Sequence, residues 1–307
     1  MIRKFLKFLE DEHKKNPEDY LSFYHEYHMF LKQGVCQDYK FMDTLSKLIM
    51  FESSAKQPNE LITFDDYISR CPPEQKEIYY LSAPSREAAL SSPYYEAFKK
   101  NNREVLLLYN TVDDFVMNNI RTYSGRNLIS AETSSIKFDD KDEPKAEEGQ
   151  KTKLTEQESK DLGEWFRLVL GDKRVREVRA TQRLSDSPAI VTDHQSGALR
   201  RMMRMVESAN NKANTADLLP PQIFEFNPSH PVIVELFESK DNPNGAAPLV
   251  AEQLFDNALM AAGLLEDPRS MLPRLNELLL KSMKRDSSEP GLPTNHADPE
   301  DEEKQGV

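Results

Sequence analysis

The spacing of apolar residues changes near residue 56, and this change limits the folds that the chain can adopt. Before it, apolar side chains recur every three or four positions, which is the spacing of an amphipathic helix. Examples are Ile2, Phe5, Leu6 and Leu9. We therefore predict a helical coil over residues 2–55.

Beyond this point, β-prone runs alternate with helical stretches as far as residue 138. The β-prone runs are 78–81, 105–109 and 128–130, and the helical stretches lie near 85–101 and 112–122. Ser92 with Pro93, and Thr111 with Asp114, are the expected helix starts. Strands that alternate with helices favour a parallel sheet, so 56–138 is predicted to be a small α/β subdomain.

A second unit is predicted over residues 153–285. Residues 139–152 lack periodic apolar positions and contain Pro144 and Gly149, which is typical of a linker. After it we expect a helix near 155–170, β-like runs near 174–184 and 188–193, and a helix near 197–212. Extended segments at 223–226 and 231–237 follow. Two closing helices are expected at 248–263 and 268–284, with Asp267 as the cap of the last. The predicted fold class is α+β, and its mixed α/β second unit ends in a helix pair.

The net charge of −12 is concentrated in two stretches. Residues 139–148 carry a net −4 and residues 286–307 a net −6, so the rest of the chain is nearly neutral. The second stretch is polar and contains proline, and we expect a disordered acidic tail there. No basic stripe is left for nucleic acid, and no apolar run approaches the roughly 20 residues that span a bilayer. We therefore expect neither a nucleic-acid partner nor a membrane span.

The sequence offers no catalytic, cofactor or metal site. Its ten glycines form no phosphate-binding loop. His25 and His28 share a helix face without a third ligand, which favours a solvated face over a metal site. The acid pairs at 65–66 and 113–114 lie at expected helix starts, where carboxylates act as caps. Cys36 and Cys71 are too few for a disulfide framework, which suits a reducing compartment.

Two features predict binding surfaces instead of a catalytic site. The helix near 197–212 carries an apolar stripe with a further methionine beside it. Its residues are Leu199, Met202, Met203, Met205 and Val206. Methionine is flexible, so an exposed stripe of it suits partners of varied shape. Burial in the core is the commoner place for such a stripe, and the pattern leaves both interpretations open.

The closing helices are the second feature, because each has an apolar face. The first face consists of Val250, Leu254, Phe255, Ala258, Ala261 and Ala262, and the second of Met271, Leu272, Leu275, Leu278 and Leu279. No folded segment is predicted after them to cover these faces. Two copies of the chain are therefore expected to complete a four-helix bundle across a two-fold axis. Packing against the chain's own second unit fits the same pattern.

Several segments between about 20 and 285 resemble the heat shock protein 90 family of molecular chaperones. Residues 69–115, with Ser92-Pro93 and Glu96, resemble the second half of the family's middle domain. Residues 224–233 and 254–268 resemble its carboxy-terminal domain. The resemblance implies that 1–138 is the end of a middle domain and that 153–285 is a dimerisation domain.

The resemblance also implies a location and a mode of action. Residues 51–55, 83–86, 92–97 and 267–279 are most similar to the mitochondrial branch, so we expect a mitochondrial protein, with a cytoplasmic one as the alternative. The acids near residue 10 are unlike a transit peptide. The resemblance implies a homodimer that holds unfolded or partly folded client proteins, with the methionine-bearing helix facing the cleft between protomers.

Full-length members of the family bind ATP with Mg and hydrolyse it in an amino-terminal domain. The resemblance places that domain before the matched segment, so we expect no ATPase activity and no cofactor in this chain. An alternative function is that of a short, non-catalytic protein that pairs with full-length chaperones and alters their cycle.

Overall fold

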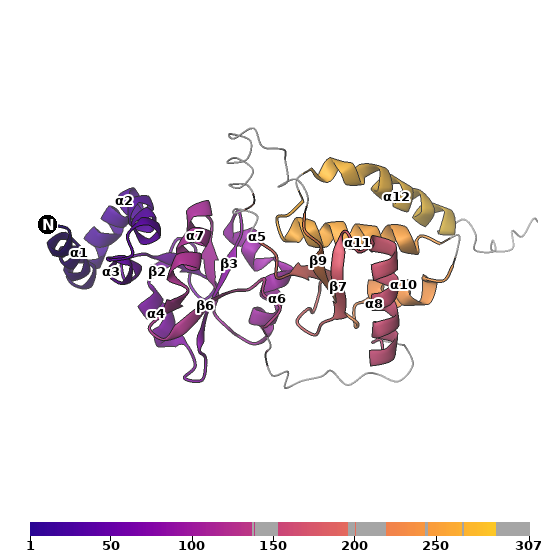
Figure 1. Cartoon of the computed structure of the whole chain (residues 1–307), viewed down its shortest axis with the longest axis horizontal. Helices are drawn as coiled ribbons and strands as arrows, with labels where there is room; N and C mark the ends of the chain where they lie inside the picture. The colour runs from indigo at the N-terminus through magenta and orange to yellow at the C-terminus, as the bar shows by residue number, and fades with distance from the viewer. Residues whose placement is uncertain are drawn as a thin grey trace, which may run out of the picture.

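The computed structural model describes residues 1–136, 138, 153–195, 200, 219–242, 245–265 and 267–286. Over these ranges the chain is an α+β protein, as predicted, and its two β-sheets follow one another along the long axis (Figure 1). We call residues 1–138 the first unit and residues 153–286 the second unit. The predicted linker at 139–152 and the acidic tail from residue 287 lie outside the described residues.

The chain begins with helices, as the apolar spacing predicts. These are α1 (Ile2–Lys15), α2 (Pro17–Gln37) and the short α3 (Met42–Ser46). Leu6 and Leu9 of α1 are buried, whereas Ile2 and Phe5 are exposed. The coil ends before residue 55, because Phe51–Ser53 is already the first strand, β1.

The first unit is built on a six-stranded sheet with the order β2-β1-β4-β3-β6-β5. At its centre β3 (Glu77–Ser82) pairs in parallel with β4 (Leu106–Leu108) and β6 (Arg126–Ser130), which confirms the predicted parallel layer. The pairings of β1, β2 (Leu61–Ile62) and β5 (Thr122–Tyr123) at the two sides are antiparallel. The helices of this unit are α4 (Phe64–Arg70), α5 (Arg86–Leu90), α6 (Pro93–Lys100) and α7 (Thr111–Ile120).

Helix caps explain where these helices begin. The predicted helical stretch at 85–101 consists of α5 and α6, and the predicted start at Ser92 and Pro93 is confirmed, because the Ser92 hydroxyl accepts from the Tyr94 amide and Pro93 occupies the first turn. The cap of α7 is Asn110 and not Thr111, since the Asn110 amide donates to Asp113 at 3.3 Å. Asp66 closes a capping box with Thr63 at the start of α4. The prediction that acids at 65–66 and 113–114 act as caps is thus confirmed for one member of each pair.

A buried ion pair ties α2 to α7. The Lys32 ammonium lies 2.6 Å from the Asp113 carboxylate, and both side chains are almost fully buried. The same ammonium lies 4.6 Å from the centre of the Phe51 ring, a cation–π contact. Because water cannot reach either charge, each stabilises the fold only while the other is present.

The second unit is built on a three-stranded sheet with the order β7-β9-β8. The strand β9 (Gln222–Phe226) is parallel to β7 (Val175–Ala180) and antiparallel to β8 (Ala189–Thr192). The predicted helix near 155–170 is α8 (Glu156–Leu170). The predicted extended segment at 231–237 is wrong: it is the helix α10 (Pro231–Ser239), with Pro231 in its first turn and His230 as its cap.

The closing helices are present, but only one of them leaves its apolar face open. They are α11 (Ala247–Ala261) and α12 (Leu272–Asp286), with the short 3-10 helix η1 (Pro268–Met271) between them and capped by Asp267. The expectation that the chain leaves the α11 face uncovered is wrong. The Phe255 ring lies 5.7 Å from that of Phe224 on β9, so the helix packs on its own sheet. The buried members of that face are Leu254, Phe255, Ala258 and Ala262.

Replacing Lys32 with Met tests the buried ion pair. We expect a loss of about 3–5 kcal/mol in the free energy of unfolding, because the Asp113 charge is left buried without its partner. Urea denaturation measures this loss, and adding Asp113→Asn should restore part of it. The control Lys56→Met removes an exposed partner of Glu60 and should cost less than about 1 kcal/mol. Equal losses for the two lysines would contradict the argument.

Candidate functional site

The helix α12 rests on α11 through polar contacts. Arg274 donates to Glu252 at 3.0 Å and to Gln253 at 3.2 Å, and it also pairs with Asp256. Arg174, from the start of β7, reaches the same Asp256 at 3.3 Å. The orientation of α12 is therefore fixed by charge, which leaves its apolar side chains free to face outward.

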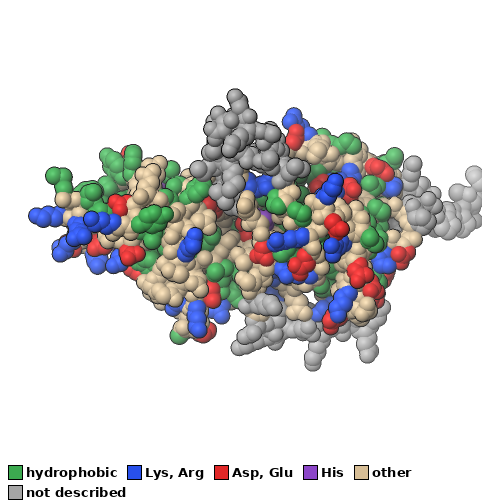
Figure 2. Space-filling view, viewed as in Figure 1, with side chains coloured by type: hydrophobic (Ala, Val, Ile, Leu, Met, Phe, Trp, Pro, Cys, Tyr) green, Lys and Arg blue, Asp and Glu red, His purple; other side chains and the backbone are tan. Residues whose placement is uncertain are grey.

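An apolar stripe runs along the outer face of α12. Leu279 is 62% exposed and Met283 is 72% exposed, and hydrophobic side chains are visible along this helix in Figure 2. We define the α12 stripe as Leu272, Leu275, Leu279, Leu280 and Met283; Leu275 is half-buried and the others are exposed. A run of exposed apolar side chains on a helix that is itself anchored is typical of a protein–protein contact.

The sequence identifies this stripe only in part. Leu272 and Leu279 were predicted at the interface and are exposed, whereas Met271 is buried within the chain. Leu280 and Met283 were missed, although Met283 follows Leu279 by four positions and the helical period alone could have included it. Among the predicted residues of α11, Ala261 is exposed and Val250 is half-buried.

The predicted client-binding stripe cannot be placed. Leu199, Met202, Met203, Met205 and Val206 all lie outside the described residues. Arg200 is the one position of that helix that the structure describes, and its side chain is buried.

A pocket of about 510 Å³ lies at the carboxyl ends of β3 and β4. The later part of α5 and the beginnings of α6 and α7 line it, and the end of α11 with Gly263 forms another part of its wall. Crevices at the carboxyl ends of parallel strands are common binding places in α/β proteins. Two acids of the first unit, Asp114 and Glu132, face this one, and the Ser82 hydroxyl donates to Asp114.

Glu132 in this pocket holds its proton at neutral pH. Burial, with a smaller contribution from the Asp114 carboxylate, raises the pKa of Glu132 to about 8. Its carboxyl oxygen lies 4.0 Å from the imidazole Nε2 of His194, whose pKa is lowered by burial. A neutral Glu132 beside a neutral imidazole avoids an uncompensated charge between the two units.

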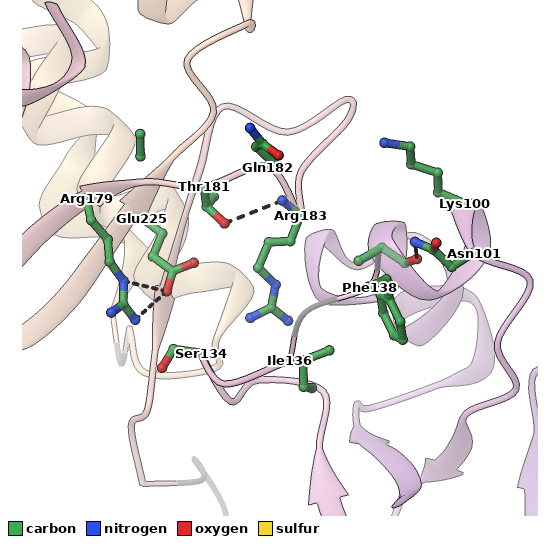
Figure 3. Close-up of a pocket in the computed structure, with 12 residues that line it drawn as sticks. Lys100, Asn101, Ser134, Ile136, Phe138, Arg179, Thr181, Gln182, Arg183 and Glu225 are labelled. Carbon is green, nitrogen blue, oxygen red and sulfur yellow. Dashed lines mark hydrogen bonds and ion pairs between the residues drawn. The ribbon is translucent and has the colours of Figure 1, made fainter. Parts of the chain in front are cut away.

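A second pocket, of about 400 Å³, opens where the two units meet (Figure 3). Arg183 extends from the loop after β7 toward Ser134 and Ile136 of the first unit, and its guanidinium donates to the carbonyls of Ala131 and Thr133. Arg179 pairs instead with Glu225 of its own sheet, at 2.8 Å. Burial lowers the pKa of the Arg183 guanidinium. The pocket thus has a mixed polar and apolar lining, and it is shaped by contacts that join the units.

Neither pocket assembles recognisable catalytic chemistry. Within the described ranges, no three His, Cys, Asp or Glu side chains gather into a group suited to a metal ion. On α2, Nδ1 of His28 lies 3.2 Å from the His25 carbonyl, and the His28 ring lies 5.6 Å from that of Tyr24.

The part of the chain that the structure describes also contains no helix with the length and apolar character to cross a membrane.

Glu132→Gln tests the raised pKa. Because folding raises the pKa of Glu132 from 4.5 to about 8, the folded state binds its proton more tightly than the unfolded state. Wild-type stability should therefore fall as the pH rises from about 4.5 to about 8 and stay level above it. The variant lacks this fall and should be more stable by up to several kcal/mol near pH 9, at about 1.4 kcal/mol per pKa unit.

Urea denaturation between about pH 5 and pH 9 measures this difference. The control is Glu87→Gln at an exposed site on α5. If the Glu132 variant and the wild type lose stability in parallel over this range, Glu132 is ionised in the folded protein.

Comparison with known proteins identifies the family. The model of the Hsp90 protein family matches residues 1–306. The chaperone protein HtpG of Desulfitobacterium hafniense is 40% identical, over 92% of this chain and 44% of that protein. The mitochondrial TNF receptor-associated protein 1 homolog of Dictyostelium discoideum is 38% identical, over 91% of this chain and 38% of that protein. The mitochondrial heat shock protein 75 kDa of Bos taurus is also 38% identical, over 92% of this chain and 40% of that protein.

Bacterial and mitochondrial relatives are thus similar to this chain to almost the same degree. The chain spans about two fifths of the length of these curated relatives. With a family match over nearly its whole length and these identities, the chain belongs to the Hsp90 protein family.

Proposed function

We propose that this chain is the client-handling and self-associating part of an Hsp90-family molecular chaperone. The α12 stripe is the observation that carries the proposal, because it is an apolar surface on an anchored helix that one copy of the chain leaves exposed. Relatives that carry the name chaperone support it. In this proposal residues 1–138 form the end of a middle domain and residues 153–285 a dimerisation domain.

The dimer is proposed to form between two α12 stripes across a two-fold axis. Such a contact is self-complementary, so each copy buries the same side chains. The interface differs from the one expected from sequence, since most of the apolar face of α11 already belongs to the chain's own core. The α11 helix then supports α12 from behind and is not itself the contact surface.

ATP binding and hydrolysis are proposed only for a full-length chaperone of this family. In that context ATP and Mg would act on a domain that this chain does not match, and this chain would transmit the resulting movement. Client proteins would be held on the methionine-bearing stripe from Leu199 to Val206, because non-native chains display apolar surface that folding would bury. A mitochondrial location is supported by two relatives that are named as mitochondrial, beside an equally similar bacterial one.

Leu279→Glu combined with Met283→Glu tests self-association. Each exposed apolar side chain buried on dimerisation contributes about 1.5–3 kcal/mol, so two charged replacements should weaken the dimer at least about 100-fold. Sedimentation velocity measures the shift from dimer to monomer at micromolar concentration. The control Leu168→Glu alters an exposed leucine on α8 and should leave the dimer intact. A monomeric wild type, or a dimeric double variant, would refute this contact.

Met202→Ser combined with Met203→Ser tests client handling. We expect the chain to lose most of its ability to slow the aggregation of a thermally unfolding reporter enzyme, because two flexible apolar contacts become polar. Light scattering follows the aggregation. The control is Met29→Ser on α2, an exposed methionine outside the predicted stripe. Equal protection by all three proteins would remove this stripe from the proposed function.

A further inference from the structure

Glu96 of α6 holds a loop of the second unit. One of its carboxylate oxygens accepts from the backbone amides of Ser185, Asp186 and Ser187, at 2.6, 3.1 and 3.4 Å. The other oxygen accepts from the Ser187 hydroxyl. Glu96 is 89 residues distant from the first of these donors, so the contact joins the two units and not neighbours in sequence.

This contact is strong for a side chain that is only half-buried. Successive backbone amides that point at one anion form a concave binding place, and hydrogen bonds to a charged acceptor are shorter and stronger than neutral ones. Both oxygens of the carboxylate are used, and their donors come from the loop that connects β7 to β8. This side chain therefore holds residues 185–187 of the loop against α6.

Several other hydrogen bonds between described residues of the two units involve the same segment. The Tyr94 hydroxyl donates to the Val191 carbonyl, and the Asp193 carboxylate accepts from the amide of Ser134 at 2.9 Å. Arg183 donates to the carbonyls of Ala131 and Thr133. Residues 183–194 thus supply these hydrogen bonds beside the shared apolar core, and Glu96 holds the part of the segment at 185–187.

Docking sets the direction in which the α12 stripe faces. The helix α11 packs on the sheet to which β8 belongs, and α12 is fixed to α11 by Arg274. A rotation of the second unit on the first therefore turns α12 as well. In a two-fold dimer, that rotation changes the distance between the two first units.

We propose that Glu96 is a positioning residue that fixes the angle between the units and thereby the width of the cleft between two protomers. The cleft part of this proposal rests on the proposed dimer. Glu96 is better suited to this role than Tyr94, which is fully buried in the shared core and whose loss would disturb folding itself. Glu96 is only half-buried on the outer side of α6, so its contact can be removed without opening the core.

The experiment compares Glu96→Gln and Glu96→Ala with the wild-type chain. Gln keeps one oxygen that can accept from the backbone amides, but it replaces the other oxygen, which accepts from the Ser187 hydroxyl, with an NH2 group. Ala removes the contact completely. The control is Glu87→Ala, which removes an exposed carboxylate from α5. Circular dichroism establishes that each variant keeps its helices. Two measurements then test the Glu96 contact and the angle between the two units.

Hydrogen exchange at residues 185–187 is the first measurement. We expect exchange to be roughly tenfold faster or more in Glu96→Ala, with a smaller increase in Glu96→Gln and none in the control, because these amides lose their acceptor. Small-angle X-ray scattering is the second, and the maximum dimension of each particle should increase in the Ala variant. Unchanged exchange and unchanged scattering in Glu96→Ala would overturn the proposal.

The two proposals fail in different ways. If the wild type sediments as a monomer, the dimer and its cleft are wrong, while the exchange rates and the monomer scattering still test Glu96. If the wild type is a dimer and Glu96→Ala leaves both measurements unchanged, the dimer stands and the positioning role of Glu96 is wrong. If Glu96→Ala is a dimer of unchanged mass with a larger maximum dimension, both are supported.

Discussion

Tyr94 is fully buried at the place where the two units meet, and its hydroxyl donates to the Val191 carbonyl. A buried hydroxyl without an acceptor costs free energy, so each unit is complete only when it is folded against the other. The apolar core confirms this dependence, because one continuous cluster includes Tyr79 and Phe98 of the first unit and Phe166 and Phe224 of the second. The two sheets therefore share part of one apolar core.

This shared core has consequences for function. Under the proposed function, movement of the first unit would pass to α11 through the packed core, and from α11 to α12 through the contacts of Arg274. The charged groups at the junction meet separate partners: backbone amides donate to Glu96, and the two terminal nitrogens of Arg183 donate to backbone carbonyls while its Nε is buried without a hydrogen bond. Burial favours the protonated form of Glu132 by raising its pKa to about 8. Such an arrangement holds its angle by hydrogen bonds, which are directional, while the apolar core supplies most of the attraction.

The distribution of apolar residues between α11 and α12 shows how far sequence patterns can be taken. Both helices have an apolar face in the sequence, and the pattern is compatible with either a dimer contact or packing against the chain's own second unit. Phe255 and Leu254 turn out to be core residues, whereas Leu279 and Met283 remain at the surface. A pattern records that a face is apolar but not what covers it, since the sheet that covers α11 is formed by residues about 30 to 80 positions earlier.

Local features were predictable because they depend on neighbouring residues. The parallel strands, the start of α6 at Ser92 and Pro93, the α8 helix and the cap at Asp267 all follow from short patterns. The helix at Pro231 was misread as extended, because the same proline is compatible with either structure. The contacts that join the two units depend instead on residues that are far apart in the sequence. The family resemblance includes Glu96 but says nothing of its partners. Only the tertiary structure brings it to the amides of residues 185–187, since a contact over 89 residues leaves no trace in local spacing.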